Sequence, residues 1–252
     1  MFKDTLIVAI GTAISRLTGL LRVVVLGIII GQTALADAFD GANNSPNSIY
    51  ELLVGGLLAA SLVPLFTRFA EDDDEEATNA VVSVSLIVLG IATAIAIAAA
   101  PLIFRLFSLQ VSPLVDPVLF RHVGTVMTRI FLVQIFFYGL TAIASALLNS
   151  RRHFFAAAWC PVLSNIITIT LLLVIPFTRD GTPGLQDVLA DQKFFWLFTL
   201  SATGGVMAMG LVLIPALKHA NIPLRFTPNF SHPAVRTMVK LSSWTFGYVV
   251  TN

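Results

Sequence analysis

Charged side chains are scarce in this chain of 252 residues: Asp, Glu, Lys and Arg make up 12% of it, whereas hydrophobic residues make up 56%. A soluble domain carries about twice that share of charge. The shortage excludes an ordinary soluble protein and predicts an integral membrane protein. The formal net charge of +1 indicates no partner by itself, because in a membrane protein the place of each charge along the spans is what matters.

Cysteine is almost absent as well. Cys160 stands alone, so it cannot form a disulfide within the chain, and we interpret it as a small packing residue. The histidines have no metal-ligand spacing, and neither a Walker loop nor a pair of catalytic carboxylates is found. The sequence therefore predicts no metal site and no bound cofactor, and it supports neither ATP-driven transport by this chain nor an enzyme.

Long apolar runs fill most of the chain. A helix needs about 20 mainly apolar residues to cross a bilayer, so these runs predict an all-α, polytopic helix bundle. The first run is too long for a cleavable signal peptide and is expected to stay in the mature protein. Spans are expected at about residues 5–30, 36–70, 78–104, 122–148, 154–177 and 194–217.

A seventh span begins near Val235 and is still running at Asn252. We therefore expect the N-terminal part of a longer transporter, with a six-helix lobe at residues 1–228 and a truncated seventh helix at 229–252. Basic residues are retained on the cytoplasmic side, and they favour an N-terminus in the cytoplasm. The inner flanks would hold Lys3, Arg68, Arg151, Arg152, Lys218, Arg225, Arg236 and Lys240, and the outer flanks Arg105, Arg121, Arg179 and Lys193.

The first span carries two arginines. Ser15 and Arg22 lie on one helical stripe with Gly11 and Gly19, and Arg16 lies about 100° round from Ser15. Small residues at this spacing allow close approach of another helix or leave an open groove. A charge at this depth costs at least about 2.5 kcal/mol and normally faces a bundle interior or a watery cavity. Something must therefore compensate for both arginines.

Three explanations stay open. In the first, the arginines pair with an internal acid, namely Asp37, Asp40 or Glu51, and fix helix packing. In the second, they bind an anionic ligand, since the planar guanidinium group is suited to phosphate. In the third, their charged ends reach to the membrane interface. Arg129 in the fourth span has either a cavity role or a packing role, and Asn165 in the fifth is expected to form an interhelical hydrogen bond.

The second span contains "NNSPNS" at 43–48. Pro46 lacks an N–H, so we expect the helix to be interrupted there, with Asn47 and its polar neighbours satisfying the freed backbone groups. Such breaks in transporters mark binding sites or hinges, although a plain proline kink is the alternative. Gly55 and Gly56 add bending points and favour a mobile gate.

These features resemble the MurJ/MviN family, the lipid II flippases of the multidrug/oligosaccharidyl-lipid/polysaccharide transporter superfamily. The resemblance is carried by "AISRLTGLLRVVVLGIIIG" and "ADAFDGANNSPNSIYELLVGGLLAASLVPLF", and it continues through "ALLNSRRHF" and "CPVLSNI". It implies fourteen helices in two lobes plus a C-terminal pair, around a cationic cavity. It also implies alternating access that moves the lipid-linked peptidoglycan precursor to the outer leaflet of the bacterial plasma membrane.

By position, the resemblance implies that Ser15, Arg16 and Arg22 contact the ligand's headgroup or pyrophosphate. Asp37 matches an acid of the outer gate, and Asn47 matches the asparagine of the helix break. The chain departs from the family pattern after the break: many members have an arginine there, where this chain has Tyr50 followed by Glu51, and Arg129 is a candidate substitute.

The implied partners are lipid II, membrane lipids and cell-wall synthesis proteins, without nucleic acid, and the implied energy source is a membrane potential or an ion gradient. Other exporters of the superfamily, for polysaccharide-linked lipids or cationic drugs, are alternatives. A drug exporter would want acids rather than Arg16 and Arg22 in its cavity. A non-transporting scaffold with internal salt bridges is the third alternative.

Overall fold

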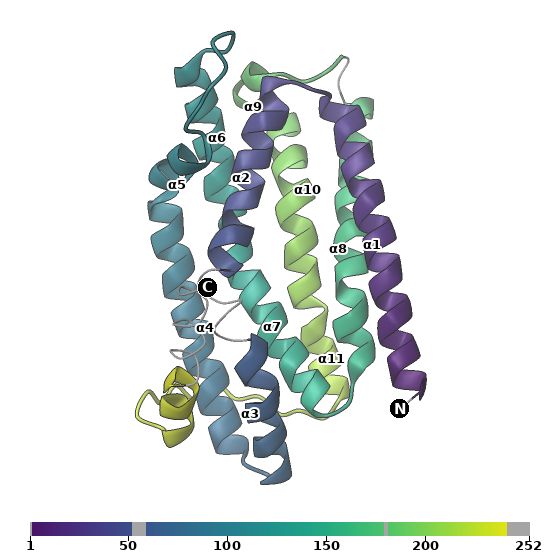
Figure 1. The fold of residues 1–252 in the computed structure, drawn as a ribbon, viewed down its shortest axis with the longest axis vertical. Coiled ribbons are helices and arrows are strands. Elements are labelled where there is room, and N and C mark those ends of the chain that lie inside the picture. The colour runs from purple at the N-terminus through teal and green to yellow at the C-terminus, as the bar shows by residue number, and fades with distance from the viewer. Residues whose placement is uncertain (1, 52–58, 179–180, 241–252) are drawn as a thin grey trace.

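A computed structural model describes residues 2–51, 59–178 and 181–240, and the regular structure of these residues is entirely helical. The chain is a multi-pass membrane protein of the all-α class, as the sequence predicts (Figure 1). The long helices are α1 (Phe2–Ile30), α2 (Ala34–Tyr50), α3 (Ala59–Glu71), α4 (Glu75–Ala98), α6 (Pro117–Phe131), α7 (Gln134–Ser150), α8 (Phe154–Val174) and α10 (Gln192–Leu211). The short ones are α5 (Ala100–Phe107), η2 (Ile175–Phe177), α9 (Leu185–Ala190) and α11 (Leu213–His219).

Five stretches of the described residues are long and apolar enough to cross a membrane: Asp4–Ile30, Glu75–Ala98, Pro117–Ser150, Phe154–Phe177 and Gln192–His219. Together α2 and α3 cover the second predicted span, residues 36–70, and residues 52–58 between them lie outside the described part. Residues 233–240 are helical, where the seventh span is expected to begin. The division at residue 228 stays a prediction.

The predicted interruption at 43–48 is wrong, because α2 runs through Pro46 and reaches Tyr50. Proline removes one backbone donor, here the one that would bond the Ala42 carbonyl, and a helix survives such a loss when its flanks are packed. Pro46 and Ser45 are both buried, and Ser45 Oγ donates to the Gly41 carbonyl at 2.7 Å. Gly55 and Gly56 lie outside the described residues, so their bending role stays a prediction.

Helix α8 holds the bundle together, because α1 packs on one side of it and α10 on another. Helix α2 packs on α6, and α10 also contacts α7. Aromatic side chains fill the space between α2, α6 and α10: the Phe39 ring lies 5.4 Å from that of Phe131 and 4.8 Å from that of Phe198. Cys160 is buried, consistent with the packing role predicted for it.

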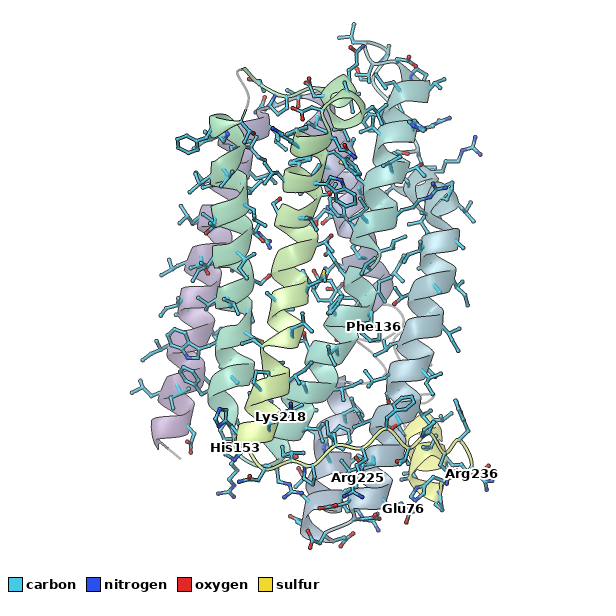
Figure 2. All side chains as sticks on the ribbon, turned by 180° about the vertical axis from the view of Figure 1, so that it is seen from behind. Glu76, Phe136, His153, Lys218, Arg225 and Arg236 are labelled. Atoms are coloured by element: carbon cyan, nitrogen blue, oxygen red, sulfur yellow. The ribbon has the colours of Figure 1, made fainter. Side chains whose placement is uncertain are left out.

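The basic residues of the predicted inner flanks gather at one end of the bundle. Figure 2 shows His153, Lys218, Arg225 and Arg236 together there, at the end that also holds the N-terminus in Figure 1. An extended segment after α11 is held against α4 at this end, because the Arg225 N–H donates to Asn79 Oδ1 at 2.8 Å and the Thr227 N–H to Ser83 Oγ at 2.9 Å.

Candidate functional site

One face of α1 is a packing surface against α8. A Cβ added at Gly11 would lie 3.0 Å from the Ala158 carbonyl oxygen, and one added at Gly19 would lie 3.6 Å from Asn165 Nδ2. Asn165 Nδ2 also donates to the Ser15 carbonyl at 3.1 Å and to Thr18 Oγ1 at 3.0 Å. The expected interhelical hydrogen bond of Asn165 is confirmed, and the small residues of α1 allow α8 to approach closely.

The two arginines of α1 differ in their exposure. Arg16 is exposed, whereas Arg22 and Ser15 are half-buried. In the part of the chain that the structure describes, neither arginine forms an ion pair with an acidic side chain; the ion pair found there joins Arg68 and Asp72, with 3.6 Å between Nε and Oδ2. The described bundle therefore contains no internal salt bridge to compensate for Arg16 or Arg22.

Helix α2 exposes a polar stripe of its own. Its exposed residues follow steps of three and four, which place them on one face. These residues are Asp37, Asp40, Asn44, Asn47, Ser48 and Glu51. Asn47 Nδ2 donates to Glu51 Oε1 at 3.3 Å, so Glu51 is engaged by an amide of its own helix. Asp37 lies in the first turn, where the positive end of the helix dipole stabilises a carboxylate.

Arg129 lies in the last turn of α6 and is exposed. Among the described residues it has no acidic partner, so the structure gives it no helix-packing ion pair. The predicted roles of Ser15, Arg16, Arg22, Asn47 and Arg129 in ligand binding, like those of Asp37 and Pro46 in gating, stay predictions. The residues that the structure describes contain no group of three or more His, Cys, Asp or Glu side chains placed to hold a metal ion.

The bundle also contains a series of side-chain hydrogen bonds that the sequence did not lead us to predict. The Tyr138 hydroxyl donates to Gln134 Oε1 at 3.3 Å, and Gln134 Nε2 donates to Thr203 Oγ1 at 3.3 Å, which links α7 to α10. Gln134 is only 1% exposed. The available signal was a glutamine and a tyrosine four residues apart in an otherwise apolar span, which places both side chains on one helix face.

Through Tyr138 this series of hydrogen bonds also meets α2. The Tyr50 ring of α2 lies 5.4 Å from the Tyr138 ring of α7. Tyr50 lies near the position where the resemblance noted in the sequence implies an arginine. An aromatic pair backed by Gln134 thus joins α2 to α7.

Comparison with known proteins decides the family. The sequence model of the family described as lipid II flippase MurJ matches residues 26–252. The chain belongs to the MurJ family. The lipid II flippase MurJ of Burkholderia cenocepacia is 29% identical over 260 residues, which cover 99% of this chain and 47% of that protein. The probable lipid II flippase MurJ of Rhizobium tropici is 27% identical over 239 residues, covering 91% of this chain and 43% of that protein.

A third relative, the probable lipid II flippase MurJ of Bdellovibrio bacteriovorus, is 26% identical over 254 residues, covering 88% of this chain and 47% of that protein. The chain thus spans about half the length of the MurJ relatives that it matches. The match of the family model begins after Ser15, Arg16 and Arg22, whereas the Burkholderia relative is similar to this chain over almost all of its length.

Proposed function

We propose that the complete protein is a lipid II flippase, which moves the lipid-linked peptidoglycan precursor from the inner to the outer leaflet of the bacterial cytoplasmic membrane. Membership of the MurJ family supports this proposal. The observation that carries it is the pair of arginines on α1 without acidic partners in the described bundle. A diphosphate headgroup is the anion that two guanidinium groups bind well, through charge-assisted and bidentate hydrogen bonds.

In this proposal Arg16 and Arg22 bind the diphosphate, and Ser15 and Asn47 contribute polar contacts to the headgroup. Arg129 supplies a further positive charge, and the isoprenoid tail stays in the lipid. The polar stripe on α2 then faces the same cavity as α1. Each polar group of the cavity gains a partner when the headgroup enters, which offsets the cost of a charge at this depth.

Transport, rather than an enzymatic reaction, follows from two states of the cavity that bind the ligand differently. Pro46 serves as a hinge of α2 in the change between these states, and Asp37 helps to close the outer side. The N-terminus lies in the cytoplasm, because the basic end of the bundle carries it. A membrane potential or an ion gradient supplies the energy, and cell-wall synthesis proteins receive the product.

The test uses the full-length protein in a strain depleted of its own flippase, and it measures the lipid II that is accessible on the outer leaflet. Arg22→Ala is expected to lower this quantity at least about tenfold, because it removes a charge-assisted contact worth about 1.5 kcal/mol or more. Arg22→Lys keeps the charge but loses the planar fork, so an intermediate loss is expected.

Arg68→Ala is the matched control. It removes an arginine that pairs with Asp72 on the surface, and it should leave transport unchanged. Protein levels in the membrane are measured for each variant, so that misfolding is separated from loss of binding. Unchanged export by Arg22→Ala at normal protein levels would show that Arg22 is structural and would remove the basis of the site.

A further inference from the structure

A second cationic cluster lies on α5 and α6, at the end of the bundle farther from the N-terminus (Figure 1). Arg105 of α5 and Arg121 and His122 of α6 line a cavity of about 610 Å³ between these two helices. Thr125 adds a hydroxyl to the same cavity. Two guanidinium groups, an imidazole and a hydroxyl make a set of donors suited to an anion with several oxygen atoms.

The helices that carry the two arginines are held together by an aromatic contact. Each follows a buried phenylalanine, and the rings of Phe104 and Phe120 lie 5.7 Å apart. Gly124 completes the contact, because any Cβ at this position would overlap the Phe104 ring. Since α5 and α6 are fixed against each other at this point, the backbone positions of Arg105 and Arg121 are set before any ligand arrives, which lowers the entropic cost of binding.

The described protein supplies no anion to this cavity. Asp116 is the acid next to it in the sequence, but its Oδ1 caps α6 by accepting the Val118 N–H at 2.8 Å and the Leu119 N–H at 3.3 Å. In residues 59–178 and the other described ranges, neither Arg105 nor Arg121 forms an ion pair. Arg121 Nε is buried and has no hydrogen-bond partner there. An unpaired buried donor is costly, so an external acceptor would be stabilised.

The surroundings of the cavity are apolar and face outward. Leu114 is 96% exposed and Leu109 76% exposed in the loop between α5 and α6. The other exposed apolar side chains nearby are Leu102, Leu106 and Val118. Exposed apolar side chains of this kind favour contact with lipid over contact with water. Arginines at the ends of spans lie at the level of the lipid headgroups.

We propose that the cavity between α5 and α6 binds the phosphate group of a membrane lipid, through Arg105 and Arg121, with the lipid chains against Leu102 and Val118. This lipid site is lined by no residue of α1 or α2, and it does not depend on the proposed transport activity. The phosphate belongs either to an anionic phospholipid of the leaflet or to a lipid-linked diphosphate, and the two sources are distinguished by the probe that binds.

The experiment titrates the purified full-length protein with phosphatidylglycerol in one arm and with undecaprenyl diphosphate in the other, and it counts bound lipids by native mass spectrometry. The double variant Arg105→Gln/Arg121→Gln is expected to weaken the tightest bound lipid of one arm at least about tenfold. Loss in the phosphatidylglycerol arm identifies a phospholipid site, and loss in the other arm alone identifies a site for the lipid-linked diphosphate.

Arg151→Gln/Arg152→Gln is the matched control, because it removes the same charge in the exposed turn at the opposite end of the bundle. It should leave the tightest bound lipid in place. Arg105→Lys/Arg121→Lys keeps the charge, and it should retain part of the affinity even if the glutamine variant folds poorly. Equal losses in the glutamine variant and in the control, or no loss in either arm, would overturn the proposal.

Discussion

Helices α1 and α10 both pack on α8, yet they are buried to very different extents. In the span Gln192–His219, which contains α10, 50% of the most apolar stretch is buried inside the bundle. In the span of α1 the corresponding share is 17%. A helix enclosed on several sides contributes mainly to packing, whereas one that packs on a single side leaves its other faces for lipid, a ligand or further protein. The arginines lie on the less buried helix, where a substitution can change binding without opening the core.

The largest effect on stability is expected at the contact of α10 with α8. A Cβ at Gly205 would lie 2.7 Å from the Ser164 carbonyl oxygen, a backbone atom that cannot rotate away. Gly205→Ala should therefore lower the stability of the full-length protein by about 3 kcal/mol, at the upper end of the usual cost of overpacking. Thermal unfolding in detergent measures the change.

The adjacent glycine gives a matched control, because a Cβ at Gly204 would have its nearest neighbour, Leu171 Cδ1, at 3.9 Å. Gly204→Ala should be neutral or slightly stabilising. If both variants unfold at the same temperature as the unmodified protein, the α8–α10 contact is looser than the structure indicates, and the contrast between α1 and α10 loses its physical basis.

A smaller effect is expected where α1 meets α8. Asn165→Leu removes the two hydrogen bonds to Ser15 and Thr18, and interhelical hydrogen bonds in membranes are worth about 0.6 kcal/mol on average. We expect a loss of about 1 kcal/mol in the same unfolding measurement. Thr170→Val, at an exposed position of α8, is the control, and a loss equal to that of Asn165→Leu would argue against a specific tie to α1.

The sequence was sufficient to predict the five spans found among the described residues, because an apolar run must be long enough to match the thickness of the bilayer. It was also sufficient for Asn165, since a lone amide in an apolar span needs a partner. It failed at Pro46, because whether a helix continues through a proline depends on how its flanks pack, and Ser45 and Pro46 are buried by other helices.

The candidate site divides in the same way. The arginines of α1 stand out in the sequence, because a charge within an apolar run is costly wherever the run folds. The link from Tyr138 through Gln134 to Thr203 joins residues on two spans, and no local pattern specifies which spans become neighbours. The same holds for Arg105 and Arg121, which sequence analysis treats only as flanking charges, and which α5 and α6 bring to one cavity.

The smallest expected effect tests whether α1 is free on its far side. A Cβ at Gly27 would have no neighbour within 4 Å, whereas one at Gly11 would lie 3.0 Å from the Ala158 carbonyl oxygen and 3.1 Å from Trp159 Nε1. Gly27→Ala should stabilise the protein by up to about 1 kcal/mol, since alanine favours a helix over glycine. Gly11→Ala gains the same helix propensity but is opposed by overpacking, so it should be the less stable variant of the two by about 1 kcal/mol.

Because both changes are made in one helix, their difference in unfolding temperature isolates the contact with α8 from the intrinsic preference of the backbone. Equal stability of the two variants would mean that α1 is not held against α8 at Gly11, and that its arginines are not fixed in place by that contact.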